Sequence, residues 1–207
     1  MAREFPDAAD KTALLEAVKD VEARSSAEVV IVVRPQSGSY AHVDLALGVV
    51  FACATLWFLL FSPWDFEPQE IFAGPLAVGA LTGLLCARAP ALRRLLTRRA
   101  ARRERVEEAA RASFVAKRVS HTRDRSGLLV YVSSLERAVE VVADRGVLER
   151  VPAHDWAAAT RALDASVGRH LDGVALAAGI RALGDVLAPA LPHGDDDVNE
   201  LPDGIEA

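Results

Sequence analysis

The sequence predicts an α/β fold in which a central mixed sheet is flanked by helices, with an inserted two-helix transmembrane hairpin. Three observations predict this architecture. Two long apolar segments, residues 43–62 and 71–87, are joined by a short acidic turn. A β-branched run, residues 28–33, precedes them, and a strand–turn–strand pattern, residues 127–143, follows them. The stretches between these parts are charged and have helical periodicity, which is typical of helices that cover a sheet.

The two apolar segments have the length and composition of membrane spans. Residues 43–62 carry one charge, on Asp44, and residues 71–87 carry none. A helix needs about 20 apolar residues to cross a bilayer. The turn holds prolines, which break helices, and aromatic residues of the kind found at membrane interfaces, such as Trp64. A buried helical pair in a soluble core is the alternative, and it is disfavoured because core helices of this length usually carry a polar face.

The distribution of charge predicts the orientation of the hairpin. The turn contains Asp65, Glu67 and Glu70 but no lysine or arginine, whereas many arginines follow the second span: Arg88, Arg93, Arg94, Arg98, Arg99, Arg102, Arg103 and Arg105. Positive residues near membrane spans remain in the cytoplasm. We therefore expect a multi-pass protein of the inner membrane with both termini cytoplasmic. Residues 43–88 form the hairpin, and residues 1–42 and 89–207 form one discontinuous cytoplasmic domain.

The partners expected from composition begin with the lipid bilayer. The net charge of −5 hides the arginine-rich segment, which is expected to contact anionic lipid head groups. Nucleic-acid binding is disfavoured because this segment lacks interleaved aromatic residues and adjoins the bilayer. Small residues recur four apart in each span, at Gly48 and Ala52 and at Gly79 and Gly83. This spacing lets the spans pack on each other or on another copy, so a homodimer remains open.

The remaining elements follow from local patterns. Asp10 is predicted to cap an amphipathic helix, and residues 28–33 are predicted to form a strand buried on both faces. Residues 91–117 are predicted to form one long helix. A strand at residues 127–133, a four-residue connection and a strand at residues 138–143 predict an antiparallel β-hairpin. The second strand is expected to pair with the first strand of the chain across the intervening helix, in a right-handed parallel crossover.

Two further helices are predicted before the C-terminus. The first runs from about residue 153 to residue 169, and Asp172 caps the second, which ends before Pro189. The acidic residues 193–203 are assigned no regular structure. Asp195, Asp197 and Asn199 alternate as in a calcium-binding loop, but Glu200 stands where the loop requires glycine, so the match is poor.

Several stretches resemble the TPM domain family, in this order along the chain: residues 26–32 (SAEVVIV), the transmembrane hairpin, residues 121–133 (HTRDRSGLLVYVS), residues 143–146 (ADRG), the helix around Trp156, and residues 198–203 (VNELPD). The arrangement is similar to the bacterial membrane-embedded branch, in which a hairpin interrupts the domain after its first strand. The resemblance implies a compact α/β sandwich.

The functions implied by the resemblance differ among relatives. They include a chloroplast lumen protein, for which acid phosphatase activity and divalent-cation binding have been proposed, and an animal auxiliary subunit of a ligand-gated channel. These roles share little chemistry, so the fold transfers better than the function. Both relatives also have their domains outside the cytosol, whereas the charge distribution places this domain inside.

The candidate site lies around the end of the last predicted strand. Asp144 and Asp124 are the candidate metal ligands, because carboxylates bind cations such as calcium or magnesium. His121, Arg123 and Arg145 are candidates for contacts with a phosphate group or another ligand, since arginine matches phosphate geometry. The alternative is that residues 144–146 form a turn in which the aspartate bonds to its own backbone.

Three functional hypotheses follow. The first is an integral membrane protein, without established catalysis, whose domain binds an unidentified protein partner or a divalent cation at the cytoplasmic membrane face. The second is a metal-assisted phosphatase that acts on phosphate esters through Asp144. The third is a structural membrane anchor. The sequence contains no recognisable nucleophile motif and no glycine-rich phosphate loop, so it does not identify catalytic residues.

Overall fold

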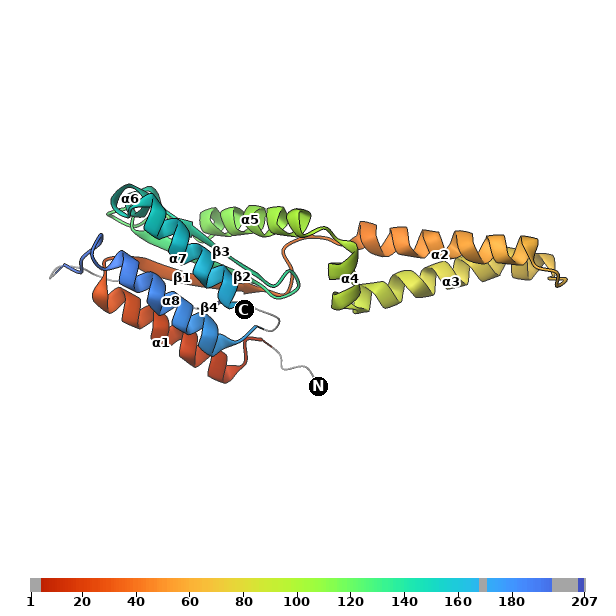
Figure 1. Cartoon of the computed structure of the whole chain (residues 1–207), viewed down its shortest axis with the longest axis horizontal. Coiled ribbons are helices and arrows are strands. Elements are labelled where there is room, and N and C mark those ends of the chain that lie inside the picture. The colour runs from red at the N-terminus through yellow and green to blue at the C-terminus, as the bar shows by residue number, and fades with distance from the viewer. Residues whose placement is uncertain (1–4, 168–170, 195–204, 207) are drawn as a thin grey trace. The chain divides into compact units, whose positions relative to one another are not determined.

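The computed structural model describes residues 5–167, 171–194 and 205–206. The chain divides into two compact units. Unit 1 comprises Met1–Ser37 together with Arg103–Ala207, and unit 2 comprises Gly38–Arg102. Unit 1 holds the strands and unit 2 holds two long helices (Figure 1). A domain built from two separate parts of the chain is therefore interrupted by a helical insertion.

The sheet of unit 1 is mixed, as the sequence predicts. The part of the chain that the structure describes contains four strands, in the spatial order β3-β2-β1-β4. They are β1 (Glu28–Arg34), β2 (Gly127–Ser133), β3 (Ala138–Ala143) and β4 (Ile205–Glu206). β1 pairs in parallel with β2 and with β4, and β2 pairs antiparallel with β3. The strand that follows the crossover, β2, is thus a parallel partner of β1, and β3 lies at one edge of the sheet.

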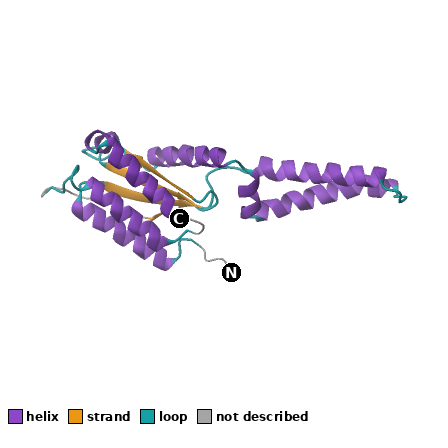
Figure 2. Cartoon of the chain, viewed as in Figure 1, coloured by secondary structure: helices purple, strands orange, loops and turns teal. Residues whose placement is uncertain are grey.

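Helices cover both faces of this sheet (Figure 2). On one face, apolar residues of β1 and β2 pack with residues of α1 (Ala8–Arg24), α7 (Ala153–Ser166) and α8 (Gly173–Leu187). On the other face, Val32, Leu129 and Tyr131 pack with Val106 and Ala110 of α5 (Arg99–Ala116). Neighbouring residues of β1 therefore enter opposite cores, which explains its continuous apolar run.

The first helix begins earlier than predicted. Asp7, not Asp10, is its N-cap: the Asp7 carboxylate accepts a hydrogen bond from the Asp10 backbone N–H at 2.9 Å, and the Asp10 carboxylate accepts one from the Asp7 backbone N–H at 3.1 Å. This reciprocal pair is a capping box. Asp10 also accepts a hydrogen bond from the backbone N–H of Gly173 at 3.2 Å. Its burial at the start of α8 depends on tertiary structure, which a local pattern does not report.

The single long helix predicted for residues 91–117 is wrong. The structure has two helices, α4 (Pro90–Leu96) and α5, and Thr97 between them is extended, with φ −107° and ψ 129°. The sequence around the break keeps a helical composition, and threonine is only a moderately poor helix former. The boundary between the two compact units lies nearby, at Arg102 and Arg103, so α4 belongs to unit 2 and most of α5 to unit 1.

Two short elements were also missed. Asp144 caps a six-residue helix, α6 (Arg145–Arg150), where the sequence predicts a turn. Residues 205–206 form β4. The carboxylate of Glu206 in this strand pairs with Arg34 at 2.9 Å and with Lys117. Elements this short carry too little periodic pattern to be recognised from sequence.

Unit 2 contains α2 (Ala41–Phe61) and α3 (Pro68–Arg88), which pack together as a hairpin. Both helices are long and apolar enough to cross a membrane, with mean hydropathies of 2.2 and 1.6. Few of their side chains are buried, and large apolar residues such as Trp57 and Phe72 are 65% and 76% exposed. This exposure does not fit a helical pair in a soluble core within the chain.

The small residues of these two helices lie at the contact between them. A Cβ atom added to Gly48 would lie 2.7 Å from the carbonyl oxygen of Gly79, and one added to Gly79 would lie 2.9 Å from that of Gly48. One added to Gly83 would lie 3.2 Å from the carbonyl oxygen of Asp44. The glycine spacing therefore serves the packing of α2 on α3, as expected where helix backbones approach closely.

Candidate functional site

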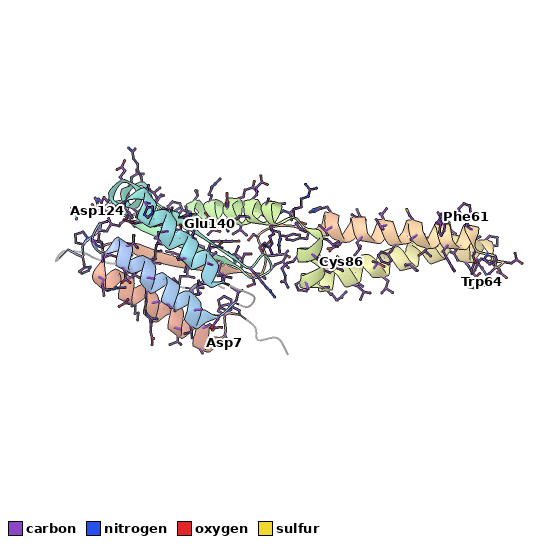
Figure 3. The ribbon with its side chains drawn as sticks, viewed as in Figure 1. Asp7, Phe61, Trp64, Cys86, Asp124 and Glu140 are labelled. Atoms are coloured by element: carbon purple, nitrogen blue, oxygen red, sulfur yellow. The ribbon has the colours of Figure 1, made fainter. Side chains whose placement is uncertain are left out.

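The fold brings the predicted site residues to one end of the sheet. Asp144 follows β3 directly, and the loop of residues 121–126 leads into β2. The backbone N–H of Asp144 donates to the carbonyl oxygen of Gly127 at 2.9 Å, so the end of β3 lies beside the start of β2. Asp124 also lies at this end of unit 1, near α6 (Figure 3). The two candidate metal ligands thus come from adjacent connections.

Asp144 has a buried carboxylate whose two oxygens differ. Asp144 is only 7% exposed. Its Oδ1 accepts a hydrogen bond from the backbone N–H of Arg145 at 2.7 Å and so caps α6. Its Oδ2 is buried and has no hydrogen-bond partner among the residues that the structure describes. The aspartate thus accepts one hydrogen bond from the neighbouring backbone, as the cap of a helix rather than within a turn, and its second oxygen is not used.

Backbone carbonyl groups crowd against the same turn. A Cβ atom added to Gly146 would lie 2.3 Å from the carbonyl oxygen of Asp124 and 2.7 Å from that of Arg125. Arg125 has a φ of 53°, in the left-handed region, and its N–H donates to the carbonyl of Thr122 at 3.2 Å. This tight loop turns its carbonyl oxygens toward Gly146, two residues after Asp144. Oxygen atoms of backbone and carboxylate are the ligands that calcium takes in proteins.

The remaining candidate residues lie at the surface. The Arg145 side chain is 77% exposed and pairs with Glu149 on its own helix at 2.6 Å. His121, Arg123 and Asp124 are exposed. Within the described ranges, no group of three or more His, Cys, Asp or Glu side chains is placed to hold a metal ion. A cation at Asp144 would therefore take some of its ligands from backbone carbonyls. The calcium-loop pattern that begins at Asp195 lies outside the described residues.

A second polar cluster, at the opposite end of the sheet, was missed by sequence reasoning. Glu136 is 6% exposed, and its carboxylate accepts hydrogen bonds from the Ser133 hydroxyl and from the Ser37 backbone N–H, the latter at 3.1 Å. The Ser37 hydroxyl donates to that of Ser133 at 2.8 Å. Burial raises the pKa of nearby Tyr131, whose hydroxyl lies 3.3 Å from that of Ser37. The cluster ties the loop after β1 to the β2–β3 turn.

A third cluster joins α5, α7 and the edge strand β3. The Arg103 guanidinium pairs with Asp164 at 2.5 Å and approaches Glu140 at 3.8 Å. Asp164 also accepts a hydrogen bond from the backbone N–H of Val139 at 3.1 Å, which occupies part of the free edge of β3. Burial of Glu140, together with the neighbouring charge of Glu107, raises the pKa of the Glu140 carboxyl despite Arg103 (Figure 3).

Comparison with known proteins adds a fold assignment. No family model matches the chain, and no curated protein matches it. The solution structure of BA42, a TPM-domain protein from the psychrophilic bacterium Bizionia argentinensis, is similar, with a TM-score of 0.60 and 17% sequence identity. The match covers 100% of this chain and 97% of that one. The fold is TPM-like. At this identity the similarity establishes the fold and not the activity.

Proposed function

We propose that this protein is a multi-pass protein of the inner membrane whose cytoplasmic TPM-like domain binds a divalent cation at Asp144. The arginines that follow α3 and the acidic turn between α2 and α3 support this orientation. The observation that carries the cation site is the buried Oδ2 of Asp144, which has no partner in the described part of the chain.

A bound cation would offset the free-energy cost of burying an unpaired carboxylate oxygen at this position. An ionised carboxylate oxygen that is removed from water without a hydrogen bond destabilises the folded state. Asp144 receives one hydrogen bond, from the adjacent backbone, and that bond involves its other oxygen. A bound cation would satisfy Oδ2 and draw on the carbonyl oxygens of Asp124 and Arg125, which lie against Gly146.

The donor set favours calcium over magnesium. Calcium accepts a mixture of carboxylate and backbone carbonyl ligands in flexible geometry, whereas magnesium requires a near-ideal octahedron and retains several waters. The exposed Asp124 carboxylate lies on the same loop and is the second side chain expected to take part.

A cation bound beside this loop would stabilise a surface for a protein partner. Its exposed His121 and Arg123, together with Arg145 on α6, would then be displayed in a fixed arrangement at the end of the domain. Hydrolysis of phosphate esters would further require Arg145 to leave Glu149, with which it pairs at 2.6 Å. We therefore limit the proposal to binding.

The test is a calcium and magnesium titration of the full-length protein in detergent, with the melting temperature as the readout. Asp144→Asn removes the charge but keeps a side chain that caps helices well. Asp172→Asn is the matched control, because Asp172 also caps a helix, accepting from the Val174 backbone at 3.1 Å. A ligand at 100 times its Kd stabilises a protein by about 2.7 kcal/mol, which corresponds to a rise of roughly 5–10 °C here.

We expect calcium to raise the melting temperature of the unmodified protein and of Asp172→Asn, and to leave that of Asp144→Asn unchanged. An equal rise in all three proteins would place the cation elsewhere. No rise in any of them would remove the cation from the proposal.

A further inference from the structure

The α2–α3 hairpin carries an apolar groove along one side. Its volume is about 500 Å³, and its walls include Leu45, Val49, Leu76 and Leu84. Gly48, Gly79 and Gly83 also line it, so that part of its floor is helix backbone. Binding sites for small ligands have volumes of about 300–1,000 Å³ and are mostly apolar. The groove is therefore large enough to hold a flexible hydrocarbon chain.

One end of the groove lies beside an ion pair. Asp44 lines this end, and its carboxylate pairs with the Arg93 guanidinium of α4 through two contacts, of 3.0 Å from Nε and 2.5 Å from Nη2. The two side chains are only 13% and 16% exposed, so each largely neutralises the other. The single acidic group that lines the groove thus adds little net negative charge to this end.

Further arginines lie at the C-terminus of α3 and directly after α4. Arg88 follows Leu84, a wall of the groove, by four residues, and side chains four apart are neighbours on a helix surface. Arg88, Arg98 and Arg99 are exposed. Leu95 of α4 is 81% exposed, so α4 combines cationic and apolar side chains in the manner of a helix at a membrane interface. The end of the groove therefore has the exposed Arg88 one helical turn beyond its wall.

We propose that this groove binds an anionic phospholipid of the surrounding bilayer, with one acyl chain along the groove and the phosphate at the arginines, Arg88 first among them. The apolar groove matches an acyl chain in volume and polarity. The excess of positive charge at one end matches the charge of the head group. The inference rests on the proposed insertion of the hairpin into a membrane and does not involve the cation site at Asp144.

A second copy of the chain fits the groove less well. The glycines that would allow another helix to approach closely are already used by α2 and α3 against each other. A symmetric partner would also bring a second set of the same arginines toward the first, and like charges repel. An anionic lipid brings opposite charge to the same place.

The test uses the full-length protein reconstituted into vesicles of equal parts phosphatidylglycerol and phosphatidylcholine. Flotation of the protein with the vesicles checks membrane insertion first. A trace of either lipid with a photoactivatable acyl chain then labels the protein, and mass spectrometry locates the labelled peptides. Ala80→Phe fills the groove, because Ala80 lines it. Ala77→Phe is the matched control, because Ala77 is exposed on α3 but does not line the groove.

We expect the phosphatidylglycerol probe to label the groove segments of α2 and α3 several-fold more than the phosphatidylcholine probe. Ala80→Phe should remove most of this labelling, Ala77→Phe should leave it unchanged, and Arg88→Gln should reduce the preference for phosphatidylglycerol. Equal labelling by both probes in protein that floats would overturn the lipid site while membrane insertion stands. A dimer in light scattering that Ala80→Phe dissociates would assign the groove to a second copy. Protein that does not float would contradict both proposals.

Discussion

At the scale of single residues, two buried carboxylates at opposite ends of the sheet differ in how they are satisfied. Glu136 receives hydrogen bonds from Ser133 and from the Ser37 backbone, one to each carboxylate oxygen. Asp144 receives one hydrogen bond, and its Oδ2 has no partner in the described structure. Buried polar groups are usually paired, so an unpaired one needs a physical explanation. This contrast makes Asp144 the candidate for an external ligand and Glu136 a structural residue.

Glu140 should make stability depend on pH. Its folded-state pKa is raised by burial and by Glu107, so ionised Glu140 opposes folding. Stability from this group is fully present below its unfolded-state pKa and is lost as the pH rises through the folded-state pKa. We expect Glu140→Gln to raise the melting temperature near neutral pH, and the gain to shrink as the pH falls toward about 4.

The measurement is thermal unfolding of both proteins in detergent between about pH 4 and pH 7.5. Glu149→Gln, which removes an exposed carboxylate paired with Arg145, is the matched surface control. A gain for Glu140→Gln that does not vary with pH would mean that the substitution acts through packing.

Gly146 should be intolerant of a larger side chain. The carbonyl oxygens of Asp124 and Arg125 would lie 2.3 and 2.7 Å from its added Cβ, and backbone atoms cannot move as easily as a flexible side chain. We expect Gly146→Ala to destabilise the protein by about 1–3 kcal/mol, as overpacked sites do. Denaturant unfolding measures this. Gly194→Ala is the control, because an added Cβ there meets no atom within 4 Å. Equal stability of the two variants would mean that the loop of residues 121–126 adjusts freely.

At the scale of elements, tertiary contacts hold α2 against α3 and occupy part of the edges of the sheet. Glycines allow the two apolar helices to approach closely, and the Asp44–Arg93 pair fastens α4 to the start of α2. The outer edge of β1 is partly occupied by β4 and by Glu22, whose carboxylate accepts from the Val29 backbone at 3.1 Å. Occupied edges protect a sheet from pairing with other chains.

Widening the helix contact should separate α2 from α3. A Cβ at Gly79 would lie 2.9 Å from the Gly48 carbonyl oxygen, so Gly79→Leu forces the helices apart. Leu45 and Leu85 are both exposed and can carry spin labels. We expect pulsed electron paramagnetic resonance to give a longer and broader distance distribution between the labels in this variant than in the unmodified protein. Ala77→Leu, at an exposed position of α3, should leave the distribution unchanged. An unchanged distribution in Gly79→Leu would show that the glycine contact does not hold the pair together.

At the scale of the whole molecule, the insertion of the helical hairpin between β1 and β2 leaves the sheet intact. The strands before and after the insertion pair in parallel from Glu28 and Gly127 to Arg34 and Ser133. Because the hairpin has two antiparallel helices of 21 residues each, the chain returns to the side from which it left. One discontinuous domain and one apolar helical hairpin can therefore coexist in a single chain.

The orientation of the whole protein is tested by reporter fusions. A reporter that is active only outside the cytoplasmic membrane should be inactive after Ala207 and active when it is inserted after Asp65, because the arginines after α3 remain in the cytoplasm. Activity after Ala207 would overturn the proposed orientation. Inactivity at both positions, with both fusions expressed, would argue against a membrane-crossing hairpin.

The sequence by itself determined the long and strongly patterned elements of this protein. Two apolar segments of membrane-spanning length, a β-branched strand and a strand–turn–strand pattern predicted the mixed sheet and its helical insertion, because burial on a sheet or in a lipid imposes period and length on the sequence. The candidate position at Asp144 was also recognisable, since it directly follows a predicted strand.

Only the tertiary structure decided which buried polar side chains have hydrogen-bond partners and which do not. The burial of Asp10 against Gly173, the break at Thr97, the two-residue strand β4 and the Ser37–Glu136 cluster depend on contacts between residues far apart in sequence or on elements too short to carry a period. The Asp144 oxygen that lacks a hydrogen-bond partner among the described residues, and the groove between α2 and α3, also depend on tertiary contacts. Both depend on the surroundings that folding gives to a residue, which no local pattern encodes.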